Sequence, residues 1–134
     1  MSPDELDPVA LGFLAEGHIA TLSSHRADGT VHVVPVAFMY SHDDRRVRII
    51  APASTVKVDN VRRHPRAAVS FVDGGRWATL EGAAFVREDE ASVERTRRDY
   101  TAKYGPPHGA RTDYVSIEID VTRVTGRFSL LGGR

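Results

Sequence analysis

The sequence predicts a mainly β protein, a small antiparallel barrel of six strands with about three short helices. Two observations support this prediction. Six segments have strand composition or alternation, and most of the connections between them are too short to hold a crossover helix. A six-stranded antiparallel sheet has to close or to pack on itself, which favours a barrel. The length fits one domain, which we assign to residues 1–134.

The chain opens with a helix and a hairpin. Asp7 followed by Pro8 is typical of a helix start, and Gly17 ends the short apolar face that follows. Strands are predicted over 18–25 and 31–40, because the turn sequence Ala-Asp-Gly-Thr separates two segments rich in β-branched residues.

The middle of the chain holds three more predicted strands and a second helix. Residues 47–51 are apolar and follow a polar turn. The breaker Pro52 comes next, and we expect the helix to begin at Ser54, which is a good N-cap. A His-Pro pair ends that helix, and an Asp-Gly-Gly turn separates strands at 67–72 and 76–87.

A third helix and a last strand complete the prediction. Three acidic residues, 88–90, suit the positive end of a helix dipole, and the helix ends near Tyr104 before Gly-Pro-Pro. Apolar and polar residues alternate over 115–121, so we expect one face of this strand to be buried and the other to face solvent.

Charge and composition argue against several classes of partner. The chain has 18 acidic and 18 basic residues, whereas nucleic-acid binders normally show a basic excess. It has no cysteine, and its six histidines do not have the spacing of a metal site. No apolar run could span a membrane and no signal peptide is visible. We therefore expect a cytoplasmic protein without a nucleic-acid, membrane or metal partner.

Lys57 is the first candidate for a binding residue. If Ser54 caps the helix, Lys57 is the third helical residue, where a cation opposes the helix dipole at a cost of about 0.3–1 kcal/mol. A bound anion would reverse that sign. Only Lys57 and Lys103 among the 18 basic residues are lysines. The segment is thus a candidate phosphate cradle, and an ordinary surface lysine is the open alternative.

Two further residues allow two interpretations each. Pro35 interrupts a strand and cannot donate to a sheet ladder, so the strand lies at an edge or supports a flat ring with its backbone. Trp77 is either a core anchor or an aromatic wall beside a glycine turn.

The Ser54–Lys57 segment also fits the Ser-x-x-Lys motif of acyl enzymes, but the other motifs of those enzymes are absent from the sequence.

Taken together, these segments resemble the split-barrel flavin and deazaflavin oxidoreductases, the family of pyridoxamine 5′-phosphate oxidase. In particular, they resemble the actinobacterial branch that uses coenzyme F420, of the F420-dependent biliverdin reductase type. The resemblance is carried, in order along the chain, by residues 19–22, 28–36, 54–61 and 77–84.

The resemblance implies a split, FMN-binding-like barrel and a homodimer with cofactor sites at the subunit interface. It places the deazaflavin ring along one strand and the phosphate-bearing tail at the second helix, and it assigns no catalytic residue. The implied cofactor-binding residues are His32, Val33, Val34, Pro35, Val36, Ala51, Ser54, Thr55, Lys57, Asn60, Val61 and Trp77.

The implied reaction is hydride transfer from reduced F420 to a conjugated small-molecule substrate, with biliverdin as one candidate. Two alternatives stay open, an FMN-dependent oxidoreductase on the same barrel and a non-catalytic carrier of F420, a tetrapyrrole or a fatty acid. FMN-using oxidases usually have an arginine-rich strand where this chain has residues 32–35, and this difference favours the deazaflavin.

Overall fold

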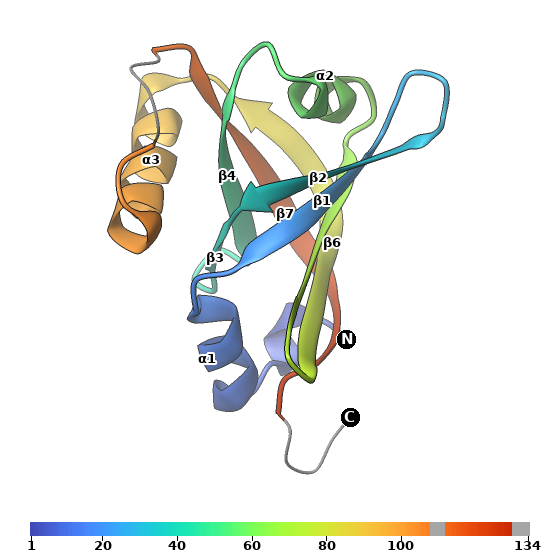
Figure 1. Ribbon diagram of the computed structural model, residues 1–134, viewed down its shortest axis with the longest axis vertical. Helices are drawn as coiled ribbons and strands as arrows, with labels where there is room; N and C mark the ends of the chain where they lie inside the picture. Colours follow the sequence, from blue (N-terminus) through green and yellow to red (C-terminus); the bar gives the residue numbers. More distant parts are fainter. Residues whose placement is uncertain (108–111, 130–134) are drawn as a thin grey trace.

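A computed structural model describes residues 1–107 and 112–129 and consists of one curled antiparallel sheet with a helix at each end and a third, longer helix alongside (Figure 1). The helices are α1 (Pro8–Ala15), α2 (Val56–Arg63) and α3 (Glu90–Tyr104), preceded by a 3-10 turn, η1 (Pro3–Glu5). The strands are β1 (Ile19–His25), β2 (Val31–Ala37), β3 (Met39–Ser41), β4 (Arg46–Pro52), β5 (Arg66–Asp73), β6 (Arg76–Arg87) and β7 (Tyr114–Arg127).

The strand order is β2-β1-β5-β6-β7-β4-β3, and all neighbours are antiparallel. One cluster of buried apolar side chains contains Val36 of β2, at one end of this order, and Tyr40 of β3, at the other end, packs against it. The sheet therefore curls around a single core, and the barrel is split between β2 and the β4–β3 pair. The predicted mainly β, antiparallel split barrel is confirmed.

The structure has seven strands where six were expected, because the predicted strand over 31–40 is broken at Phe38. The side chain of Phe38 is fully buried, and its carbonyl oxygen accepts a hydrogen bond from the Tyr104 hydroxyl at 2.7 Å. The chain changes partner at this point, since β2 pairs with β1 whereas β3 pairs with β4. A tertiary contact with α3 thus divides a continuous β segment.

Strand β7 departs from the expected alternation over its first half. Helix α3 contacts β4 and β7, so Ser116 and Glu118 are buried together with the apolar residues that alternate with them, Val115, Ile117 and Ile119. The two hydroxyls of Thr96 and Ser116 are 2.7 Å apart, and Ser116 donates to a Glu118 oxygen at 3.0 Å. Alternation resumes at the exposed Asp120, beyond the helix. The prediction of one solvent-facing side was wrong where α3 covers the strand.

Close backbone packing between β6 and β7 requires a glycine. The register of the two strands shifts between Glu81 and Gly82. A Cβ atom added to Gly82 would lie 2.0 Å from the carbonyl oxygen of Asp120.

Within residues 1–107 and 112–129, the structure has no helix with the length and apolar character needed to cross a membrane.

Candidate functional site

A groove of about 270 Å³ lies in the split of the barrel. Strand β2 forms one wall and β4 the other, while α2 and α3 each add a side chain. The residues that matter below are Pro35, Val36 and Ala37 from β2, Ile49 and Ile50 from β4, Lys57 from α2 and Tyr100 from α3. Three of the predicted cofactor-binding residues, Pro35, Val36 and Lys57, are therefore brought together in one hollow.

Pro35 lies on an edge strand, which confirms one of the two interpretations offered by the sequence, while the other, that it supports a flat ring, stays a prediction. Strand β2 is at the end of the strand order, where Pro35 lies opposite Thr21 of β1, so it belongs to an edge strand. The same residue also lines the groove. Because proline cannot donate a backbone hydrogen bond, it hinders extension of the sheet across the split and favours leaving the groove open.

The start of α2 differs by one residue from the prediction. The N-cap is Thr55, not Ser54, and Lys57 is the second helical residue rather than the third. The Thr55 hydroxyl donates to the Pro52 carbonyl oxygen at 2.9 Å, so it closes the preceding turn instead of capping the helix. The Thr55 side chain makes no capping hydrogen bond at this helix end. The first backbone N–H groups of α2 therefore have no acceptor within the helix, and they lie beside a lysine.

Lys57 lies half-buried in the groove. Burial of its ammonium group lowers its pKa, and no acidic side chain contributes to that shift. The only acidic residue in the first turn of α2, Asp59, is exposed. A partly desolvated cation beside uncapped N–H groups has the chemistry of an anion site.

Three predicted site residues point into the core. Asn60 is 1% exposed, its Nδ2 donates to the Ser24 hydroxyl oxygen at 3.2 Å, and its Oδ1 accepts from Arg63 at 2.7 Å. Val61 and Ala51 belong to the buried apolar cluster. These residues hold α2 and β4 in place, and the structure puts none of the three in the groove lining.

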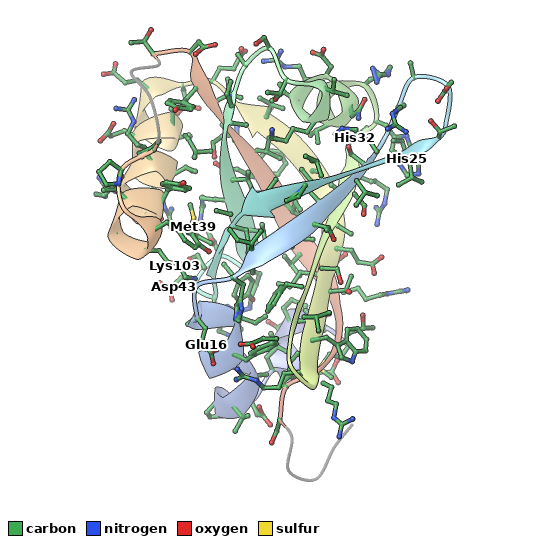
Figure 2. All side chains as sticks on the ribbon, viewed as in Figure 1. Glu16, His25, His32, Met39, Asp43 and Lys103 are labelled. Carbon is green, nitrogen blue, oxygen red and sulfur yellow. The ribbon has the colours of Figure 1, made fainter. Side chains whose placement is uncertain are left out.

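The remaining β2 residues alternate between two faces. His32 lies opposite the buried Ser24, near the hairpin end of β2 (Figure 2), and its Nδ1 is buried without a hydrogen-bond partner in the described part of the chain. Val34 packs against the core. Val33 faces outward and is 56% exposed. The predicted ring-binding segment thus contributes only its later residues to the groove of a single chain.

The outer face of β2, β1, β5 and β6 has no layer over it in the described chain. Cross-strand pairs place Val33 opposite Ser23, Ser23 opposite Ala68, and Val72 opposite Trp77, all on this face. Val72 is 74% exposed and Trp77 is 40% exposed. Trp77 follows the β5–β6 turn, which lies at the end of the barrel opposite α2 (Figure 1). One chain alone therefore does not bring Trp77 to the groove.

Sequence reasoning missed Tyr100 and the two isoleucines of the groove, Ile49 and Ile50. The isoleucines belong to a predicted strand, and Tyr100 belongs to a predicted helix. No local signal shows that α3 packs beside the split, because that placement depends on contacts such as the one between Tyr104 and Phe38.

Comparison with known proteins gives a consistent result. Residues 6–128 match the family model described as pyridoxamine 5′-phosphate oxidase. An F420H2-dependent biliverdin reductase of Mycobacterium tuberculosis (strain CDC 1551 / Oshkosh) is 38% identical over 122 residues. The match covers 91% of this chain and 88% of that relative.

Solved structures support the fold. A conserved hypothetical protein from Mycobacterium tuberculosis has a TM-score of 0.75 and 20% identity, with 90% of this chain and 84% of that chain covered. A structure described as an F420 reductase has a TM-score of 0.74 and 19% identity, with coverage of 90% and 98%. At these identities the likeness shows a shared fold.

Proposed function

The chain belongs to the pyridoxamine 5′-phosphate oxidase family, and on this basis we propose that it is a coenzyme F420-dependent reductase. In this proposal, reduced F420 transfers a hydride to a conjugated organic acceptor. The observation that carries the proposal is Lys57, which lies half-buried in the groove at the start of α2. The 38% identity to an F420H2-dependent enzyme adds to it.

The groove residues fit a deazaflavin with an anionic tail. Lys57 and the first N–H groups of α2 would hold the phosphate group, which offsets the cost of a desolvated cation at a helix start. Pro35 and Val36 on one wall and Ile49 on the other would hold a flat ring and keep water away from it. When bound, the reduced cofactor supplies the hydride.

We also propose a homodimer in which a second copy covers the outer face of β2, β1, β5 and β6. The exposed apolar side chains on this face support it, among them Ile19 at 63% and Val72 at 74%. Large uncovered apolar surfaces usually mark an interface. In such a dimer Trp77, which lies on the same face, could reach a site that one chain cannot complete.

Biliverdin is the acceptor we propose to test first, because the relative that is 38% identical is described as a biliverdin reductase. The experiment mixes the purified protein with reduced F420 and biliverdin under anaerobic conditions and follows the absorbance of both. Oxidation of F420 in step with loss of biliverdin supports the proposal. Binding of F420 without turnover of biliverdin or other conjugated acceptors indicates a carrier instead.

The FMN alternative has its own outcome. A protein that is yellow as isolated, releases FMN on denaturation and does not bind F420 would be an FMN-dependent oxidoreductase.

Location in the cytoplasm stays a prediction from the sequence.

A further inference from the structure

A second hollow, of about 370 Å³, lies beside the groove, toward α1. We call it the Lys103 hollow. Figure 2 shows Met39 and Lys103 near each other, by the lower end of α3 and above α1. Its lining includes Met39, Tyr40, Ser41, Arg48, Asp99 and Lys103.

The groove and the Lys103 hollow are lined by neighbouring residues of the same elements. Residues 35–37 line the groove and 39–41 line the hollow. On β4, Ile49 and Ile50 line the groove and Arg48 lines the hollow, while α3 gives Tyr100 to the groove and Asp99 and Lys103 to the hollow. The two hollows are therefore neighbours, the groove next to α2 and the Lys103 hollow next to α1.

Two of the charged groups in the Lys103 hollow already have partners. Arg48 is 4% exposed, and its guanidinium contacts Asp44 at 2.5 Å and Glu118 at 3.5 Å. Asp99 lies 4.0 Å from Arg95 one turn earlier on α3. Arg48 is thus neutralised and held in a fixed position, whereas Asp99 makes only a long contact with Arg95, which also lies 3.7 Å from Asp44.

Lys103 differs from these groups. It is half-buried, desolvation lowers its pKa, and no acidic residue contributes to that shift. Its Nζ lies 6.0 Å from the centre of the Phe38 ring. No ion pair involving Lys103 occurs within residues 1–107 and 112–129. Both lysines of this arginine-rich chain therefore line a hollow, half-buried and without an acidic partner.

The other walls of the hollow suit the group that would pair with Lys103. The Tyr40 hydroxyl lies 2.9 Å from His42 Nδ1 and the Ser41 side chain hydrogen-bonds Asp44, and each hydroxyl has the capacity for a further hydrogen bond. Burial raises the pKa of Tyr40 to about 12, so it keeps its proton. Met39 adds an apolar surface. A cation, hydroxyls and an apolar wall together suit a carboxylate attached to an apolar body.

We propose that the Lys103 hollow binds a carboxylate side group of the acceptor, while the conjugated part of the same molecule lies over the exposed face of the ring held in the neighbouring groove. This inference rests on the proposed function in one respect, that the groove holds the reacting molecules. It specifies the substrate class as an elongated, conjugated carboxylic acid, and it makes Lys103 a specificity-determining residue.

Amine labelling tests this inference without any turnover. The chain has three amines, namely the N-terminus, Lys57 and Lys103, so mass spectrometry can follow each one during trace acetylation. Biliverdin at about ten times its dissociation constant should slow labelling of Lys103 about tenfold, whereas its dimethyl ester should leave that rate nearly unchanged. Equal protection by the ester, or no protection by biliverdin, would overturn the inference.

The same experiment separates the inference from the proposed function. F420 alone should protect Lys57 and leave Lys103 reactive. If F420 fails to protect Lys57, the proposed cofactor site is wrong, whatever happens at Lys103. The variant Asp99→Asn, labelled without any ligand, tests whether Lys103 pairs with Asp99. If this variant changes the labelling rate of Lys103 and biliverdin does not change it in the wild type, Lys103 pairs with Asp99 in solution and the inference is also wrong.

Variants give an independent measurement by equilibrium binding. Lys103→Gln should raise the dissociation constant of biliverdin about tenfold, because a charge-assisted contact is lost, and should leave that of the dimethyl ester unchanged. Lys103→Arg should retain the preference for the acid. Arg98→Gln removes an exposed cation from the same helix and is the matched control. If Arg98→Gln and Lys103→Gln weaken biliverdin binding equally, the effect comes from the change in net charge and the inference is overturned.

Discussion

The amide of Asn60 donates a hydrogen bond from Nδ2 to the hydroxyl oxygen of Ser24 at 3.2 Å and so ties α2 to β1. The other end of the same amide accepts from Arg63 at 2.7 Å. Asn60 does not line the groove, yet it fixes the helix that carries Lys57. The wall of the candidate site therefore depends on a buried polar contact behind it.

Asn60→Ala should lower the free energy of unfolding by about 1–3 kcal/mol, because the Ser24 hydroxyl and the Arg63 guanidinium lose a buried partner. Urea denaturation followed by circular dichroism measures this change. Asp59→Ala, at the exposed neighbouring position, should cost less than about 1 kcal/mol. Similar losses for both variants would contradict the buried role of Asn60.

Gly82→Ala should destabilise the protein severely, by about 3 kcal/mol or more, because its Cβ would lie 2.0 Å from the Asp120 carbonyl oxygen. Gly12→Ala is the matched control. A Cβ at Gly12, in α1, meets nothing within 4 Å, so that change should be neutral or stabilise by up to about 1 kcal/mol. Thermal unfolding of both variants checks the β6–β7 packing, and a stable Gly82→Ala protein would show that packing to be wrong.

Val33→Asp should convert the proposed dimer to a monomer, since it places a charge in the outer face of β2. It should also weaken F420 binding if the sites need both subunits. Val9→Asp changes an exposed valine on α1 and should leave the mass in solution unchanged. Sedimentation equilibrium measures both variants. A wild-type monomer, or a dimeric Val33→Asp protein, would contradict the proposed interface.

The lowered pKa of Lys57 gives a pH dependence with a definite sign. The unfolded chain binds a proton at Lys57 up to its ordinary pKa of 10.5, whereas the folded chain releases it at lower pH. Between these two values the contribution of Lys57 to stability therefore increases as the pH rises. Over the same window the affinity for the anionic cofactor should decrease, because the ammonium form is lost.

Fluorescence titrations with F420 across the alkaline range check this. Lys57→Arg keeps its charge, so its affinity should fall less steeply with pH than that of the wild type. Parallel curves for the two proteins would mean that Lys57 does not titrate in contact with the cofactor.

Local sequence signals predicted the fold well where local chemistry decides. Both predicted helix N-termini are confirmed. Asp7 accepts a hydrogen bond from the Ala10 N–H at 2.9 Å, and Asp89, one of the acidic residues 88–90, accepts one from the Ser92 N–H at 3.0 Å. The strand predicted over 76–87 coincides with β6. Each of these boundaries is set by residues within a few positions of it.

The larger errors arise where a distant contact decides. The break at Phe38 depends on Tyr104, which follows it by 66 residues. The one-residue shift of the N-cap to Thr55 is a smaller error of local origin, at a turn that the Thr55 hydroxyl closes on Pro52. The core position of Asn60 depends on Ser24, which precedes it by 36 residues. The site was predictable at Pro35, Val36 and Lys57 only through family resemblance and helix electrostatics, since no local pattern shows which elements meet at the split.

A fluorescence titration of the wild-type protein and Lys57→Ala with F420 tests the central claim most directly. We predict wild-type binding at micromolar concentration or tighter, and at least about tenfold weaker binding by Lys57→Ala, with little change in its melting temperature. Arg98→Ala, which removes an exposed cation, should bind like the wild type. Absence of binding by the wild type, or equal affinities of the wild type and Lys57→Ala, would contradict the account.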